Sequence, residues 1–60
     1  MSEENYLDVA TKAARLERDR DYKAAEAMWL SAQSSATKDA NVVWCETRAS
    51  ICKHRAEKNR

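Results

Sequence analysis

The sequence contains neither glycine nor proline among its 60 residues. Tight hairpins and the turns between β-strands normally use both types, glycine for positive backbone φ angles and proline for its fixed φ. Without glycine, the chain also lacks the glycine-rich loop that cradles phosphate groups in many nucleotide-binding proteins. Alanine, glutamate, lysine and arginine are abundant instead, and all four favour helices. The composition therefore predicts an all-α protein whose helices are joined by short polar turns.

Cysteine is also scarce, because Cys45 and Cys52 are the only two. If both lie on one helix, their Cα atoms are separated by roughly 10 Å at about 1.5 Å per residue. A disulfide needs Cα atoms within about 7 Å of each other. A structural zinc site needs four ligands in close pairs, whereas the chain has a single histidine, His54. We therefore expect no disulfide and no metal, and cysteines that are buried as small hydrophobic residues.

Long apolar runs are absent as well, since no stretch approaches the roughly 20 residues of a transmembrane helix. The first eight residues contain Glu3, Glu4 and Asp8 but no basic residue, which is the opposite of the start of a secretion signal. Two cysteines without such a signal are typical of a reducing compartment. We expect a cytoplasmic protein that does not contact membranes.

Apolar side chains recur three and four residues apart over three segments, which is the period of an amphipathic helix. We predict helices over about 4–18, 22–36 and 40–55, within one domain of residues 1–60. The wholly charged segment 18–21 would form the first turn, with Asp19 or Asp21 capping the second helix and Asp39 capping the third. The residues expected in the core are Ala13, Leu16, Tyr22, Ala25, Trp29 and Ala32.

The short first turn predicts that the first two helices are antiparallel neighbours. Their core residues stand at the offsets of a tetratricopeptide unit, in which small residues let two helices approach and a large aromatic residue fills the gap; a generic helical hairpin is the alternative. Such units normally stack, because two helices cannot bury their own apolar face. The third amphipathic helix, a second chain, or both must cover that face. We predict a homodimer that uses the third helix and part of helix one or two.

Charge is unevenly placed although the net charge is only +1, since five of the 11 Lys and Arg residues lie in 48–60. Cations at a helix C-terminus are favoured by the helix dipole, and they can also bind nucleic acid, in which case Lys53, Arg55 and Lys58 would make the contacts. Catalysis has little support: His54 stands between two basic residues, and no serine or cysteine has an evident base at helical spacing. We expect neither an enzyme nor a cofactor.

Trp44 and Arg48 lie one helical turn apart, so the guanidinium group can stack on the indole ring. Tryptophan and arginine are also enriched at the positions that dominate the energetics of protein interfaces. Trp29 is expected in the core, whereas for Trp44 an interface position and a core position both remain open. The residues predicted to contact a partner or a second copy are Val43, Trp44, Arg48, Ile51 and Cys52.

Several of these residues form a pattern with a known counterpart: Ala14, Glu17, Tyr22, Ala25, Trp29, Ala32, Asn41, Trp44-Cys45, Arg48-Ala49 and Cys52. The pattern resembles the ANR family of small bacterial regulators, which are named for negative regulation of AraC-type activators. More distantly, the chain is similar to PerC-like activators, which share a helical hairpin followed by a helix bearing arginine and cysteine. The likeness covers roughly residues 10–55, and its specific part is the run Asn-x-x-Trp-Cys-x-x-Arg-Ala-x-x-Cys. The first turn departs from it, since members often carry Gly or Asn there.

The resemblance implies a cytoplasmic, dimeric, all-helical negative regulator that binds an AraC-type virulence activator by protein–protein contact. It would block dimerisation of the activator or its binding to DNA, and some members also contact nucleoid proteins of the H-NS type. Two alternatives stay open. One is a regulator that binds DNA directly through the basic C-terminal residues, although the net charge of +1 argues against it. The other is a mobile-element-encoded inhibitor of a different regulator.

Overall fold

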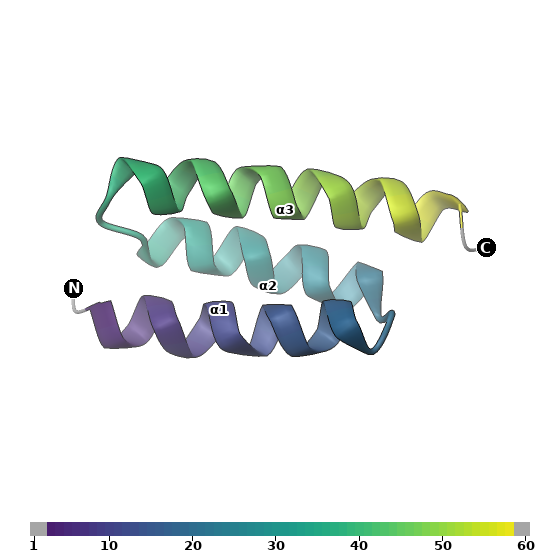
Figure 1. The fold of residues 1–60 in the computed structure, drawn as a ribbon, viewed down its shortest axis with the longest axis horizontal. Helices are drawn as coiled ribbons and strands as arrows, with labels where there is room; N and C mark the ends of the chain where they lie inside the picture. Colours follow the sequence, from purple (N-terminus) through teal and green to yellow (C-terminus); the bar gives the residue numbers. More distant parts are fainter. Residues whose placement is uncertain (1–2, 59–60) are drawn as a thin grey trace.

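The computed structural model describes residues 3–58, which form three α-helices and no strand (Figure 1). Helix α1 spans Glu3–Arg18, α2 spans Tyr22–Ser35 and α3 spans Asp39–Lys58. The direction of the chain reverses at both turns, so α1 and α2 run antiparallel and α3 again runs opposite to α2 (Figure 1). The prediction of an all-helical protein is confirmed. The third helix begins one residue before the predicted range and ends three residues beyond it.

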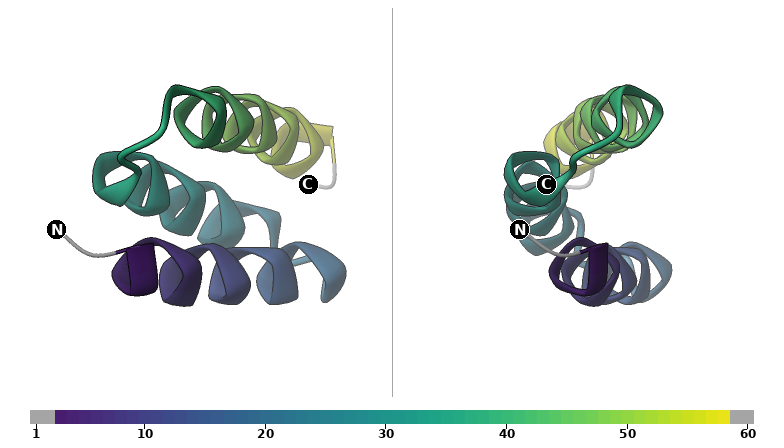
Figure 2. Two further views of the ribbon diagram at one scale, coloured as in Figure 1. Left: turned by 60° about the vertical axis from the view of Figure 1, so that its left-hand side comes forward. Right: turned by 90° about the vertical axis from the view of Figure 1, so that its left-hand side faces the viewer.

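Helix α2 is the middle element and packs against both of the others, whereas α1 and α3 meet only weakly. Seen nearly along the helix axes, α1 and α3 lie on the same side of α2, so that the three helices form an open V (Figure 2). The Cα atoms of this three-helix arrangement extend over 36 × 17 × 13 Å. The arrangement leaves one concave side, which faces away from α2.

The turn after α1 is closed by two backbone hydrogen bonds characteristic of a Schellman motif. The N–H of Asp21 donates to the carbonyl of Leu16 at 2.9 Å, and the N–H of Arg20 donates to the carbonyl of Glu17 at 3.0 Å. Arg20 has a φ angle of 65°, in the left-handed region where glycine is normally found. A side chain with a Cβ atom costs roughly 1 kcal/mol in this conformation. The fold therefore tolerates a strained arginine at this turn.

The caps predicted for the second and third helices differ in outcome. Asp21 does occupy the N-cap of α2, but its side chain makes no capping hydrogen bond. The prediction that Asp39 caps α3 is wrong, because the helix already begins at Asp39. The carbonyl of Lys38 accepts the N–H groups of Asn41 and Val42, each at 3.0 Å. Asp39 instead places its charge in the first helical turn, where the helix dipole favours an acidic residue.

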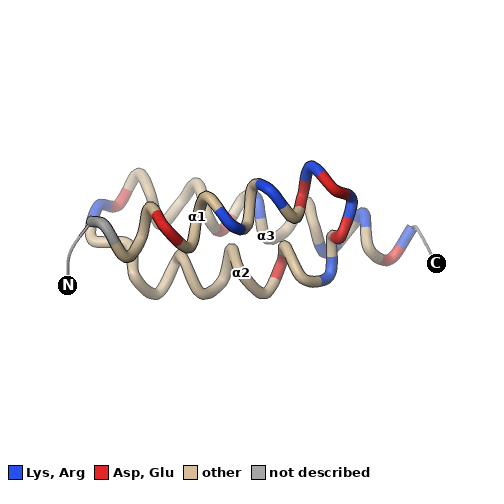
Figure 3. Tube along the Cα trace, turned by 90° about the horizontal axis from the view of Figure 1, so that it is seen from below, with Lys and Arg blue, Asp and Glu red and all other residues tan. Residues whose placement is uncertain are grey.

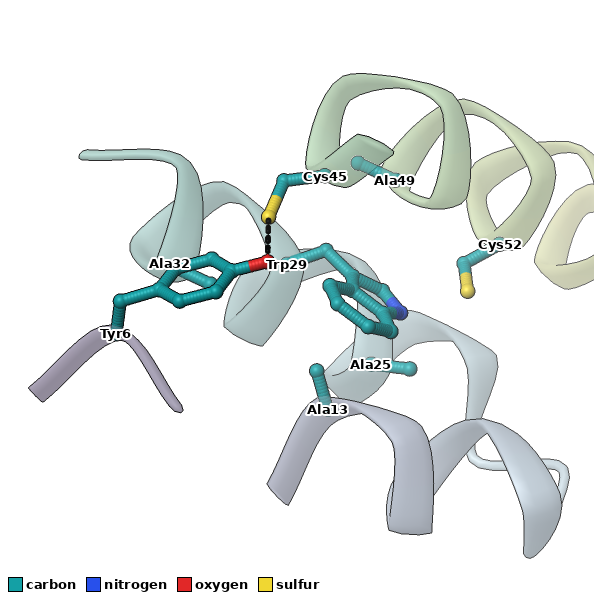
Figure 4. Packing of buried hydrophobic residues seen from close by; sticks show 8 residues of the cluster. All are labelled: Tyr6, Ala13, Ala25, Trp29, Ala32, Cys45, Ala49 and Cys52. Atoms are coloured by element: carbon teal, nitrogen blue, oxygen red, sulfur yellow. Dashed lines mark hydrogen bonds between the residues drawn. The ribbon is translucent and has the colours of Figure 1, made fainter. Parts of the chain in front are cut away.

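The core is built from small residues around two large rings, those of Tyr6 on α1 and Trp29 on α2 (Figure 4). Small side chains let α2 approach its neighbours closely, and the indole then fills the remaining space. Of the residues expected in the core, Leu16 and Tyr22 are only partly buried and pack at its edge, while the others are buried. The buried cluster consists of Tyr6, Ala13, Ala25, Trp29, Ala32, Cys45, Ala49 and Cys52.

Candidate protein-interaction groove

A groove of about 640 Å³ occupies the concave side of the helices, between α1 and α3. Helix α2 contributes two large aromatic side chains to its lining, those of Tyr22 and Trp29. The rest of the lining is mainly basic. We refer to this depression as the groove, and its lining residues are Ala14, Glu17, Arg18, Arg20, Tyr22, Trp29, Trp44, Arg48 and Arg55.

A polar contact in the groove joins all three helices. The carboxylate of Glu17 on α1 accepts hydrogen bonds from Nε of Arg48 on α3, at 3.3 Å, and from Nη2 of the same side chain. It also accepts the indole N–H of Trp29 on α2, at 3.1 Å. The side chains of Arg48 and Glu17 are only 25% and 12% exposed. Because α1 and α3 meet only weakly, this ion pair is an important link between them, alongside the contact of Cys45 with the Tyr6 hydroxyl.

Trp44 stands on the α3 side of the groove with 52% of its surface exposed. Its ring meets that of Trp29 edge to face, with centroids 6.5 Å apart and planes at 88°. The guanidinium carbon of Arg48 lies 5.5 Å from the Trp44 ring centroid, as the spacing of the two residues predicted. Trp44 is therefore not a core residue. Contacts on two sides hold its ring in a defined orientation while half of it faces solvent.

Cations gather where the groove reaches the turn between α1 and α2. A further depression of about 300 Å³ continues from the groove and is lined by Arg20, Tyr22, Arg55 and Lys58. The guanidinium carbon of Arg55 lies 5.7 Å from the centroid of the Tyr22 ring. Figure 3 shows the charged positions of the chain concentrated at this turn and along the C-terminal half of α3. Aromatic rings and positive charges are thus placed side by side at this end of the groove.

The predicted contact residues on α3 do not share one surface. Trp44 and Arg48 line the groove, and Ile51 is half-buried on the same stripe as Trp44, seven residues further along. Val43 is 61% exposed but does not line the groove. The assignment of Cys52 to a partner interface is corrected, because Cys52 is fully buried in the core.

The three residues predicted to contact nucleic acid are exposed but do not form one basic face. Lys53 and Arg55 are two positions apart, which places them roughly 200° apart around the helix. Arg55 and Lys58 border the same depression near the first turn. Lys53 instead lines a separate depression together with Lys23 and two glutamates.

Four lining residues were not singled out by the sequence pattern. Arg18 and Arg20 were assigned to the turn, and their contribution to the groove depends on how α3 packs. Ala14 entered only through the family resemblance, and so did Glu17. Its partner Arg48 is 31 positions away, so no local spacing signals the pair.

The two cysteines are free thiols inside the core. Burial raises the pKa of the Cys45 thiol, which donates a hydrogen bond to the Tyr6 hydroxyl at 3.9 Å. Burial also raises the pKa of Cys52, and the nearby charges of Arg48 and Arg55 offset part of this rise. Protonated, enclosed thiols are poor nucleophiles.

Two absences concern residues 3–58 alone. No group of three or more His, Cys, Asp and Glu side chains in this part of the chain is placed to hold a metal ion. No helix within the same residues combines the length and the apolar character needed to cross a membrane.

No family model matches the chain, and neither a curated protein nor a solved structure matches it significantly. The resemblance to the ANR family therefore rests on the residues that carry it.

Proposed function

We propose that this protein is a small cytoplasmic regulator of transcription that acts by protein–protein contact. In this proposal it binds an AraC-type activator and blocks the dimerisation of the activator or its binding to DNA. The observation that carries the proposal is Trp44, a large aromatic residue that is 52% exposed and yet fixed in orientation by Trp29 and Arg48. Exposed aromatic residues beside an arginine are the groups that dominate many protein interfaces.

The energetics support a docking role for this ring. A tryptophan side chain can bury roughly 200 Å², so covering the exposed half of Trp44 removes roughly 100 Å² from water. At about 25 cal/mol per Å², this burial gives a favourable transfer free energy of about 2.5 kcal/mol, which offsets part of the entropy lost on association. The bond between Arg48 and Glu17 holds the guanidinium in place before any partner arrives. A pre-ordered side chain loses less conformational entropy on binding.

The class of the partner comes from the family resemblance, as does a possible second partner of the H-NS type. The finer description of the fold also belongs to this proposal. The α1–α2 hairpin, with alanines around Trp29, fits a single tetratricopeptide-like unit, and α3 takes the place where the next unit would begin.

A capture experiment with purified components tests the proposal. The chain is immobilised and incubated with a purified AraC-type activator, and the Trp44→Ala variant is compared with Leu30→Ala. Leu30 is a matched control because it is also a large exposed hydrophobic residue, at 47%, but lies on α2 outside the groove. We expect Trp44→Ala alone to lose capture. Equal capture by both variants and the parent chain would remove Trp44 from the mechanism.

We also propose that the chain forms a homodimer through α3 and part of α1 or α2. Exposed apolar side chains on α1 and α3 support this, namely Leu7 and Val43. Light scattering across a concentration series gives the test. A mass equal to one chain at high micromolar concentration would contradict the dimer.

Direct DNA binding is the second candidate, and the cations near the first turn favour it. Phosphate contacts by Arg20, Arg55 and Lys58 would make affinity fall steeply with salt concentration. A gel-shift on promoter DNA without any protein partner separates the two functions. Tight and salt-sensitive binding there would favour the DNA-binding function over the protein-contact function.

A further inference from the structure

We propose that the groove binds an extended acidic segment of a partner protein, with an apolar side chain of that segment against Trp44 and its carboxylates beside Arg18, Arg20 and Arg55. This inference rests on the proposed function in taking a protein as the partner. It adds the chemistry of the segment that the groove recognises. Three observations support the inference: the charges of the groove, the backbone angle of Arg20 and the position of the apolar surface.

The groove has unpaired positive charge along one side. Its single acidic lining residue, Glu17, is already engaged by Arg48. Among residues 5–58, whose side chains the structure describes, the ion pairs are those of Lys12 with Asp8 and of Arg48 with Glu17. Within these residues the guanidinium groups of Arg18, Arg20 and Arg55 therefore line the groove without a carboxylate partner. A ligand that supplies carboxylates would pair with these guanidinium groups through charge-assisted hydrogen bonds.

The backbone at Arg20 is a separate observation. Its φ angle of 65° favours glycine, so the arginine side chain comes at a cost to the stability of the turn. The same side chain borders both the groove and the depression that continues from it. Strained residues that persist at the edge of a concave surface often serve binding. The cost is explained if the cation at this position contacts a ligand.

The apolar surface lies directly beside the cations. Trp44 lines the groove, and half-buried Ile51 extends its stripe towards the C-terminal end of α3, where Arg55 follows one turn later. A segment that lies along α3 can therefore place an apolar side chain on Trp44 and a carboxylate near Arg55. Such alternation of apolar and acidic residues is a property of a polypeptide.

A nucleic acid fits this groove less well than an acidic peptide. A duplex carries one negative charge per roughly 1.7 Å of its axis, so its backbone would pass close to several acidic side chains. Glu17 stands in the groove itself, and exposed Asp19 and Asp21 flank Arg20 in the turn. A peptide can place one or two carboxylates among the arginines and avoid these sites.

The test uses the intrinsic fluorescence of the full chain, because its two tryptophans both line the groove. The probe is a synthetic peptide in which leucine stands among aspartates and glutamates. A matched peptide carries asparagine and glutamine in their place, and single-stranded oligothymidylate serves as the polyanion. The decisive variant is Arg20→Gly, which removes the cation and at the same time relieves the backbone strain, so that loss of binding cannot reflect loss of folding. Lys38→Glu, at the other turn, controls for a change of net charge.

We expect the acidic peptide to change the fluorescence of the chain with an affinity that Arg20→Gly weakens by about fivefold to tenfold, as for a partly exposed charge-assisted bond. Lys38→Glu should change the affinity for the acidic peptide by less than about twofold. Equal binding of the neutral peptide, equal or tighter binding of the oligonucleotide, or no binding at millimolar peptide would each overturn the inference. A dimer that dissociates in Arg20→Gly, without peptide binding, would overturn it in favour of a second copy in the groove.

The capture experiment with an activator separates this inference from the proposed function. If the acidic peptide binds but no activator is captured, the regulatory function fails and the peptide-binding groove stands. If Arg20→Gly captures the activator as well as the parent chain does, the groove chemistry fails and the regulatory function stands.

Discussion

Removal of the carboxylate of Glu17, which is largely buried between the three helices, is expected to loosen the whole fold. The substitution Glu17→Ala leaves the guanidinium of Arg48 and the indole N–H of Trp29 without their acceptor. It also removes the ion pair that joins α1 to α3. No other carboxylate lines the groove to replace it.

The expected loss lies between two known limits. An exposed ion pair contributes about 0–1 kcal/mol, whereas removal of one partner from a buried pair costs about 3–5 kcal/mol. The Glu17 and Arg48 side chains are 12% and 25% exposed, so the Glu17→Ala variant should lose about 2–3 kcal/mol of unfolding free energy. For a chain of this size the melting temperature should then fall by about 8–24 °C. That is a large share of the roughly 3–5 kcal/mol that one small core supplies.

Urea unfolding followed by circular dichroism at 222 nm measures the effect. A double-mutant cycle with Glu17→Ala and Arg48→Ala isolates the pair, and we expect a coupling of about 1–2 kcal/mol. The exposed pair of Lys12 and Asp8, at 3.7 Å on α1, is the matched control and should couple by only about 0.3–0.5 kcal/mol. A Glu17–Arg48 coupling no larger than this control would refute the reasoning.

Three further predictions concern the turn, the thiols and the two tryptophans. Arg20→Gly should raise the free energy of unfolding by about 1 kcal/mol in urea titrations, because glycine adopts a positive φ without strain. Burial raises the pKa of Cys45 and Cys52, so that the unfolded chain loses its thiol protons at a lower pH than the folded chain does. The free energy of unfolding should therefore fall as pH rises past roughly 8.5. The expected slope is up to about 1.4 kcal/mol per pH unit for each thiol. The Cys45→Ala/Cys52→Ala double variant should lack this decline in stability. A double variant with the same pH profile as the parent chain would contradict the prediction. Trp44→Ala should cost about 1 kcal/mol by thermal unfolding, whereas Trp29→Ala should cost about 3–5 kcal/mol and leave the chain without a cooperative transition.

Helix positions and much of the core follow from periodicity. In α2, spacings of three and four place Ala25, Trp29 and Ala32 on one stripe, and all three are buried. Such a stripe can be found without tertiary information. The bounds of the helices are close to the predicted ones for the same reason, since charged segments and polar residues interrupt the pattern at the turns.

The third helix was harder to orient because it carries two apolar stripes. Trp44 and Ile51 form one, and Cys45 and Cys52 form the other, each pair seven residues apart. Neighbouring positions point about 100° apart, so only one stripe can face α2 fully. The cysteines are small enough for close packing against α2 and take the core, which leaves Trp44 half exposed. The residue types alone do not show which of the two stripes faces α2.

The polar contact of Glu17 and the basic lining of the groove could not be predicted from local patterns. Both depend on α1 and α3 lying on the same side of α2, which is a tertiary feature (Figure 2). The backbone strain at Arg20 also could not be predicted from local patterns. The sequence shows a charged turn without glycine, and only the backbone shows that one arginine takes the left-handed conformation.

Site-specific crosslinking in a native host tests the central claim, that the groove side of α3 contacts a transcription activator. A photoreactive phenylalanine analogue replaces Trp44 in one variant and Leu30 in the control, and adducts are identified by mass spectrometry. We predict that position 44 crosslinks to a DNA-binding activator and that position 30 does not. The same adducts from both positions, or adducts from position 44 that contain only a second copy of this chain, would contradict the account.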